Sequence, residues 1–224
     1  MTDLPRRLAA EALGTGLLVA AVIGSGIMAD ALTADDAVAL IANTLATGAI
    51  LVVLIALFGP ISGAHLNPAV SLVFALRRNL SVGEAGLFML AQVVGGIGGA
   101  LLAHAMFDLP LIELSQKIRS GPSQWLAEAV AAFGLVAVIL GGIKVQRAAV
   151  PWLVGLYITA AYWFTASTSF ANPAVTIGRA ITDTFSGIRP ADTPAFIIAQ
   201  FIGALIAMAL AGWLWTDTPQ RETA

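Results

Sequence analysis

Six apolar segments, each close to the length of a membrane span, constrain this 224-residue chain more than any other feature. They lie near residues 8–28, 37–58, 86–107, 124–144, 149–167 and 194–215. A helix needs about 20 apolar residues to cross the roughly 30 Å of hydrocarbon in a bilayer. The composition agrees, because 58% of the residues are hydrophobic, against about 45–50% in soluble domains. We therefore expect an all-α membrane protein with six transmembrane helices in the lipid bilayer.

The sequence lacks the residues that several function classes require. It has no cysteine, which excludes disulfides, thiolate metal sites and a cysteine nucleophile. The net charge of -2, without a basic cluster, argues against a nucleic-acid partner. Serine, histidine and aspartate form no catalytic pattern, and no phosphate loop or cofactor motif occurs. We expect no enzyme activity, no cofactor and no metal site.

Two further apolar pieces are too short to cross a membrane. They read "NPAVSLVFALRR" from Asn67 and "NPAVTIGRAITD" from Asn172. Asparagine is a good helix N-cap and proline suits the first helical position, so a helix is predicted to start in each. At about 1.5 Å per residue, each helix covers only half of the membrane. Such re-entrant half-helices must be covered by protein or line a wet cavity, because lipid cannot bond their backbone groups.

The chain also contains an internal repeat. Three segments recur in the same order. The segment "AEALGTGLLVA" from Ala10 returns as "AEAVAAFGLVA" from Ala127, "NPAV" from Asn67 returns at Asn172, and "AQVVGGIGGALLA" from Ala91 returns as "AQFIGALIAMALA" from Ala199. We therefore expect a single domain of two repeats, about 1–119 and 120–224. Each repeat holds three spans, an odd number, so the second must be inverted in the membrane. The half-helices then enter from opposite faces and meet at the midplane.

The basic residues predict the orientation. Seven fall on the side of the N-terminus, and these are Arg6, Arg7, Arg77, Arg78, Lys144, Arg147 and Arg221. Four fall on the other side, and these are Lys117, Arg119, Arg179 and Arg189. By the positive-inside rule, both termini are expected to be cytoplasmic.

The inverted repeat, with "SGAHLNPAV" in one half and "SFANPAV" in the other, resembles the aquaporin, or major intrinsic protein, family. The resemblance covers essentially the whole chain. It implies a homotetramer in which every subunit carries a passive pore for small neutral solutes. It also implies that Asn67 and Asn172 point their amides into the pore, while the Pro68–Ala69 and Pro173–Ala174 pairs complete the two motifs. Helix N-termini that meet at the midplane oppose the passage of cations and protons.

Three further polar residues, Glu11, Glu128 and His65, are informative. A carboxylate within an apolar span costs at least about 2.5 kcal/mol, so Glu11 and Glu128 should have partners inside the bundle. They occupy matching places in the repeat. A proton relay or a catalytic pair is one interpretation, but the resemblance favours a structural role in which they accept hydrogen bonds from the re-entrant loops. His65 is expected to anchor its loop rather than to bind a ligand or shuttle protons.

The resemblance also implies a selectivity filter. Its members would be Thr47, the backbone carbonyl near Ser169, a residue of the fifth span, and Val175, which stands where the family has arginine. Alignment from the start of the fifth span gives Tyr162, whereas counting back from Asn172 gives Ala160. We prefer Tyr162, because a helix keeps its register and a loop absorbs deletions.

The missing arginine suggests a wide filter. The segment "AYWFTASTSFANPAVTIGRA" resembles a bacterial subgroup associated with arsenic resistance. We therefore expect a channel in the inner membrane of a bacterium for neutral metalloid hydroxides such as arsenite, with glycerol-like polyols and water also passing. Arg179, one helical turn beyond Val175, could supply charge at the outer mouth, but a solvated or headgroup-facing position is preferred. The alternatives are an ion- or proton-coupled secondary transporter, with Glu11 and Glu128 as coupling groups, and a non-conducting structural protein closed by Tyr162.

Overall fold

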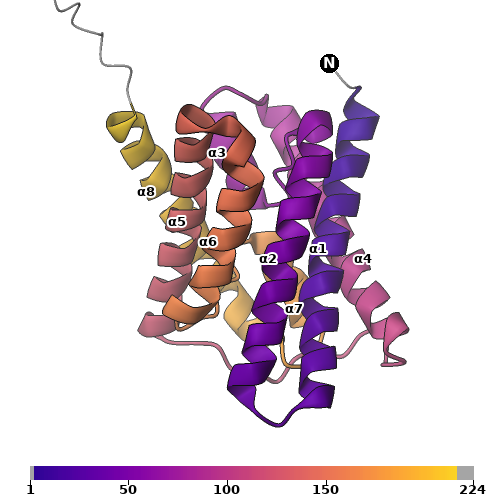
Figure 1. Ribbon diagram of the computed structural model, residues 1–224. Coiled ribbons are helices and arrows are strands. Elements are labelled where there is room, and N and C mark those ends of the chain that lie inside the picture. Colours follow the sequence, from indigo (N-terminus) through magenta and orange to yellow (C-terminus); the bar gives the residue numbers. More distant parts are fainter. Residues whose placement is uncertain (1–2, 216–224) are drawn as a thin grey trace, which may run out of the picture.

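The computed structural model describes residues 3–215, and all of its regular structure in that range is helical (Figure 1). The first half contains α1 (Leu4–Leu32), α2 (Asp36–Ser62), α3 (Pro68–Leu76) and α4 (Val82–Met106). The second half contains α5 (Pro122–Val145), α6 (Val150–Phe164), α7 (Pro173–Ala180) and α8 (Thr193–Leu214). Two short 3-10 helices, Arg147–Ala149 and Pro190–Asp192, precede α6 and α8. The all-α fold class is confirmed, and both halves have the same order of elements.

Within the described residues, five helices are long and apolar enough to cross a membrane on their own. The sixth predicted span, 149–167, corresponds to α6, which is shorter at both ends and has 15 residues. It begins after the 3-10 turn Arg147–Ala149 and ends at Phe164, because Thr165 adopts an extended backbone. At about 1.5 Å per residue, α6 is roughly 22 Å long and still crosses most of the hydrocarbon layer.

The two predicted half-helices are also confirmed. The α3 helix has 9 residues and α7 has 8, and each begins with the expected Asn-Pro pair. Asn67 and Asn172 cap these helices through their side chains, which accept hydrogen bonds from the backbone two residues further on. In Figure 1, α3 lies toward the end of the bundle that holds the N-terminus, and α7 lies toward the opposite end. We call these the N-terminal end and the far end.

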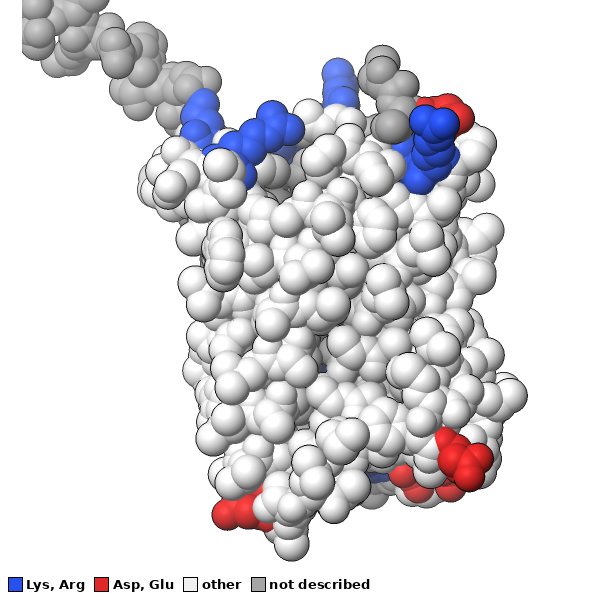
Figure 2. All heavy atoms as spheres, turned by 45° about the vertical axis from the view of Figure 1, so that its right-hand side comes forward, with Lys and Arg blue, Asp and Glu red and all other residues white. Residues whose placement is uncertain are grey.

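The charges lie at the two ends of the molecule. On the face shown in Figure 2, Lys and Arg gather at the N-terminal end, Asp and Glu predominate at the far end, and the band between them is almost entirely uncharged. This distribution fits a chain whose middle faces hydrocarbon. Arg221, which was grouped with the basic residues of the N-terminal side, lies outside the described residues.

Glycines let the long helices of each half approach closely. The α1 helix packs along α4, and α5 packs along α8. A Cβ atom on Gly95 of α4 would lie 2.1 Å from the carbonyl oxygen of Ala12, and one on Gly203 of α8 would lie 2.0 Å from that of Ala129. The two contacts occupy matching places in the repeat, so both helix pairs depend on a missing side chain. Small residues have this role in many membrane helix interfaces.

We expect Gly203→Ala to lower the thermal stability of the protein, because the added methyl group would push α8 away from α5. Overpacking of this kind costs about 1–3 kcal/mol. Gly98→Ala is the matched control, since a Cβ atom there meets nothing within 4 Å and alanine favours a helix by about 1 kcal/mol. Size-exclusion chromatography of detergent-solubilised protein after heating would compare them. Equal melting of the two variants would contradict the role given to Gly203.

Candidate functional site

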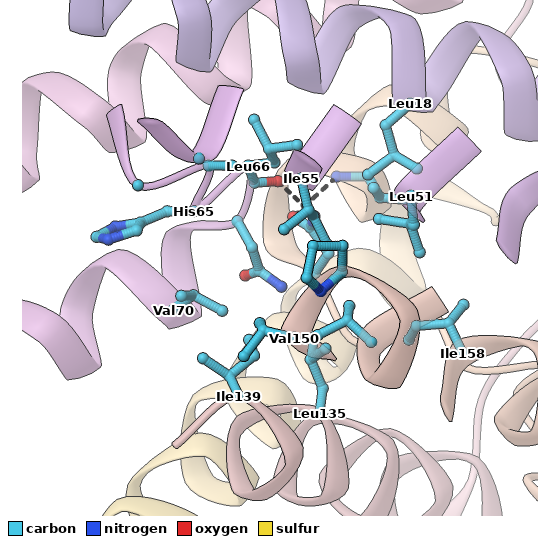
Figure 3. A pocket seen from close by; sticks show the side chains of 18 of the residues that line it. Leu18, Leu51, Ile55, His65, Leu66, Val70, Leu135, Ile139, Val150 and Ile158 are labelled. Carbon is cyan, nitrogen blue, oxygen red and sulfur yellow. Dashed lines mark hydrogen bonds between the residues drawn. The ribbon is translucent and has the colours of Figure 1, made fainter. Parts of the chain in front are cut away.

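A cavity of about 570 Å³ runs through the middle of the bundle. It extends from Arg147 and Ala148 at the N-terminal end to Arg179 at the far end, and helices from both halves form its wall. Figure 3 shows apolar side chains that converge on this space from helices far apart in the sequence. The labelled apolar residues are Leu18, Leu51, Ile55, Leu66, Val70, Leu135, Ile139, Val150 and Ile158. The wall is therefore mainly apolar, with a small number of polar groups.

The two half-helices meet in the wall of this cavity. The Nδ2 atom of Asn67 donates to the carbonyl oxygen of Ala171 at 2.8 Å, and that of Asn172 donates to the carbonyl oxygen of Leu66 at 2.8 Å. Each asparagine thus caps its own helix and bonds the loop that precedes the other one. Both asparagines line the cavity. The positive ends of two helix dipoles are brought together here, which disfavours cations.

The residues next to the asparagines are buried where the half-helices meet. Pro68 and Pro173 are the first residues of α3 and α7, and Ala69 and Ala174 follow them in the core. The loops that lead into the helices contain residues with left-handed backbone, including Leu66 at φ 50° and Ala171 at φ 51°. Side chains other than glycine disfavour this conformation, so other contacts must hold the loops in place.

Glu11 holds the first loop. Its Oε1 atom accepts hydrogen bonds from the Ser62 hydroxyl at 2.5 Å and from the His65 amide at 3.0 Å. Its Oε2 atom accepts from the Leu66 amide at 2.7 Å and from Nε2 of Gln92 at 2.7 Å. The carboxylate therefore satisfies two backbone donors that an irregular loop leaves free within the membrane.

Glu128 holds the second loop in the same way. Its two oxygens accept from the amides of Phe170 and Ala171, both at 2.9 Å, and Oε2 also accepts from Nε2 of Gln200 at 2.6 Å. The side chains of Glu11 and Glu128 are fully buried, and neither residue belongs to the cavity wall. A solute in the cavity would not contact these carboxylates.

His65 lines the cavity beside Leu66 and Asn67. Its Nδ1 atom lies 3.1 Å from the Ser71 hydroxyl, and its ring packs against the rings of Phe74 and Phe88. In the part of the chain that the structure describes, no group of three His, Cys, Asp or Glu side chains could hold a metal ion. The histidine is thus fixed to its own loop and half-helix.

The residues assigned to the filter line one region of the cavity toward the far end. These residues are Thr47, Tyr162, Ser169 and Val175. The hydroxyls of Thr47 and Tyr162 lie 3.2 Å apart, so the two side chains share a hydrogen bond between α2 and α6. Ala160, the alternative to Tyr162, is exposed on the outside of α6. The helical register counted from the start of this span therefore brings Tyr162 to the cavity.

Arg179 is not the solvated or headgroup-facing residue that the sequence favoured. It is 2% exposed and lines the cavity. Its Nε atom donates to the carbonyl oxygen of Ser186, and its guanidinium carbon lies 3.3 Å from the centre of the Phe170 ring. The loop after α7 folds back over the helix, since the Ile188 amide donates to the Arg179 carbonyl at 3.1 Å. This return of the loop covers the arginine and has no local sequence signal.

Sequence reasoning also missed Arg119 as part of the far end. Its guanidinium donates to the carbonyl oxygens of Gly187 at 2.9 Å and Ser167 at 3.1 Å, and it lies over the Phe170 ring at 5.0 Å. Burial lowers the pKa of this arginine from its ordinary value. Arg119 thus ties the loop after α4 to the loops on both sides of α7. Its isolated position in the sequence gave no indication of these partners.

Comparison with known proteins identifies the fold. The sequence model of the major intrinsic protein family matches residues 1–149 and again residues 124–223. The chain belongs to this family. The crystal structure of the aquaglyceroporin from Plasmodium falciparum has the same fold, with a TM-score of 0.75 over 93% of this chain and 95% of that chain, at 19% identity. The protein is therefore a multi-pass integral membrane protein.

Two relatives within the family are similar along most of the chain. Aquaglyceroporin AqpS of Rhizobium meliloti (strain 1021) is 69% identical over 212 residues, which cover 95% of this chain and 91% of the relative. Aquaporin NIP2-1 of Zea mays is 28% identical over 224 residues, which cover 95% of this chain and 71% of the relative. Family membership and the first relative together support a channel for water and small solutes, the class of function expected from the sequence.

We expect Glu128→Ala to destabilise this member of the family by at least about 3 kcal/mol. The substitution would leave the amides of Phe170 and Ala171 and one N–H of the Gln200 side chain without their acceptor, and each orphaned buried donor costs about 1–3 kcal/mol. Glu113→Ala, which removes an exposed carboxylate from a loop, is the control. The measurement is the fraction of monodisperse protein recovered after heating. Unchanged stability of Glu128→Ala would show that the second re-entrant loop keeps its conformation without the carboxylate.

Proposed function

We propose that this protein is a passive channel for uncharged solutes larger than water, and that neutral metalloid hydroxides such as arsenous acid are its favoured solutes. Glycerol-like polyols and water would also pass. The observation that carries this proposal is Val175, which lies in the cavity wall at the position where the family resemblance expects arginine. Arginine would fill that place with a bulky guanidinium and five donors, whereas valine offers no polar group.

The surroundings of Val175 support a wide filter. Thr47 and Tyr162 bond each other, so their hydroxyls are already partly engaged. The hydroxyl of Ser169 is buried and has no hydrogen-bond partner among the described residues. A solute with several hydroxyl groups would meet both polar groups and the apolar Val175 in the filter. That combination suits small neutral molecules that shed part of their water.

A coupled secondary transporter is less well supported. Such a mechanism would need Glu11 or Glu128 to exchange protons or ions with the solute pathway. Both carboxylates are buried away from the cavity wall and are occupied by loop amides and glutamine side chains. A non-conducting protein, closed by Tyr162, is the remaining alternative, and osmotic light scattering distinguishes it directly.

We further propose that the channel is a homotetramer in a bacterial inner membrane, with both termini in the cytoplasm. The rhizobial relative supports a bacterial membrane. The gathering of Lys and Arg at the N-terminal end supports the orientation through the positive-inside rule. In this orientation Thr47, Tyr162 and Val175 stand on the extracellular side of the paired asparagines.

The proposal is tested by a solute panel on purified protein in liposomes. Arsenous acid, glycerol, urea and water are compared by light scattering after an osmotic step. We expect swelling with arsenous acid and glycerol that rises linearly with the gradient and does not depend on a pH difference. Saturable, pH-driven uptake would favour a coupled transporter. No swelling above that of empty liposomes with any solute would refute a channel.

We expect Val175→Arg to reduce the permeability to glycerol and arsenous acid by at least about tenfold, the scale on which a tight site rejects an oversized group. Water should be affected much less, because it passes a narrow filter. Val175→Leu controls for side-chain volume without adding charge. The ratio of water to glycerol permeability is the measurement. An unchanged ratio in Val175→Arg would remove Val175 from the filter.

A further inference from the structure

Arg179 is a buried cation that the proposed filter does not use. It lies in the cavity wall with 2% of its surface exposed, and its Nη1 atom has no hydrogen-bond partner among the described residues. Within residues 3–215, no carboxylate forms a salt bridge with it. A desolvated charge without a counter-ion is costly. A residue of this kind in a channel wall suggests a role toward the solute.

Two contacts and the helix dipole make the charge tolerable at this position. The face of the Phe170 ring lies against the guanidinium, and the Ser186 carbonyl accepts from Nε. Cation–π contact of this kind stabilises a desolvated arginine. Arg179 is also in the last turn of α7, where the negative end of the helix dipole favours a cation.

The dipole of α7 has the opposite effect on a cation at the position of Val175. That residue is in the first turn of the same helix, where the positive end of the dipole opposes a cation. Four residues separate the two positions, which is about one turn and a rise of roughly 6 Å. The helix therefore holds a charge more easily at Arg179 than at Val175, on nearly the same face.

We propose that Arg179 is a specificity-determining residue of this channel, whose guanidinium repels cations and offers a donor to solute oxygens one turn outward from the uncharged Val175. The inference rests on the proposed function and deepens it. The filter is then divided into a wide, uncharged ring at Val175 and a cationic mouth at Arg179. Solutes rich in hydroxyl groups are the class that this mouth accepts, because Arg179 and Ser169 both line the cavity and each has a buried polar atom without a partner among the described residues.

The division has a consequence for ion exclusion. Without Arg179, the widened channel would depend mainly on the midplane dipoles to exclude cations. A charge in a cleft with low-dielectric walls changes local ion concentrations by about tenfold or more. Arg119 adds to the positive field beside Phe170, but its guanidinium is bonded to carbonyls and it is not part of the cavity wall. Arg179 is therefore the cation that lines the cavity at the far end, whereas Arg147 lines it at the N-terminal end.

The test uses methylammonium as a cationic probe of small-solute size and glycerol as a neutral one, with the full chain in liposomes. Arg179→Met keeps the length of the stem and removes the charge, and Arg179→Gln removes the charge but keeps a donor. We expect both to raise methylammonium flux by roughly tenfold, while Arg179→Lys stays close to the parent. Lys117→Gln is the control, since Lys117 is an exposed cation outside the cavity wall at the same end.

A rescue experiment separates a filter role from a structural one. Adding Val175→Arg to Arg179→Met restores a cation to the filter, so the ratio of methylammonium to glycerol flux should return to that of the parent. Val175→Leu in the same background adds volume without charge and should leave the ratio raised. Flux is compared only among variants that elute from size-exclusion chromatography at the same volume as the parent. Two charge-free substitutions, Arg179→Met and Arg179→Gln, are used so that the test can proceed if one of them does not fold. Methylammonium flux equal to that of the parent in a folded charge-free variant would overturn the inference. It would also be overturned if Arg179→Met and Arg179→Gln both failed to fold while Arg179→Lys folded. A parent that passes neither glycerol nor arsenous acid would instead refute the proposed function.

Discussion

Two broken helices in the middle of a membrane leave backbone donors that neither lipid nor a regular helix can satisfy, and the architecture depends on how these donors are bonded. Glu11 and Glu128 accept them, one carboxylate for each loop. A carboxylate buried in a span is costly by itself, and an unbonded amide is costly too. Together they remove both costs, because each carboxylate oxygen receives at least one amide or side-chain donor.

The same bonds determine the shape of the cavity. Loops held by the carboxylates keep left-handed residues such as Leu66 and Ala171 in place, and their carbonyls accept from the asparagine of the other half. Each half therefore completes the capping of the other. Since α3 and α7 approach end to end, their positive dipole ends face one region of the cavity, which follows from the inverted repeat and needs no charged side chain.

The sequence predicted what local chemistry and the repeat determine. Apolar length identified the long helices, Asn-Pro pairs identified both half-helices, and the repeat paired Glu11 with Glu128. The end of α6 at Phe164 and the burial of Arg179 could not be predicted, because both depend on loops whose course is set by tertiary contacts. The loop after α7 covers Arg179 only because it returns to bond the helix and the loop after α4. A charge near an apolar segment looks solvated until such a cover is known.

The far end also links the support of the loop to the charge at the mouth. The carboxylate of Glu128 holds the Phe170 amide at 2.9 Å, and the Phe170 ring in turn lies against the guanidinium of Arg179. The position of the cation therefore depends on a loop whose conformation is disfavoured without its carboxylate. A channel that carried arginine in place of Val175 would hold its charge in the first turn of α7, whereas Arg179 is in the last turn of that helix. Moving the charge to the last turn gains the favourable end of the helix dipole, and it makes the electrostatics of the mouth depend on the same bond that holds the half-helix in the membrane.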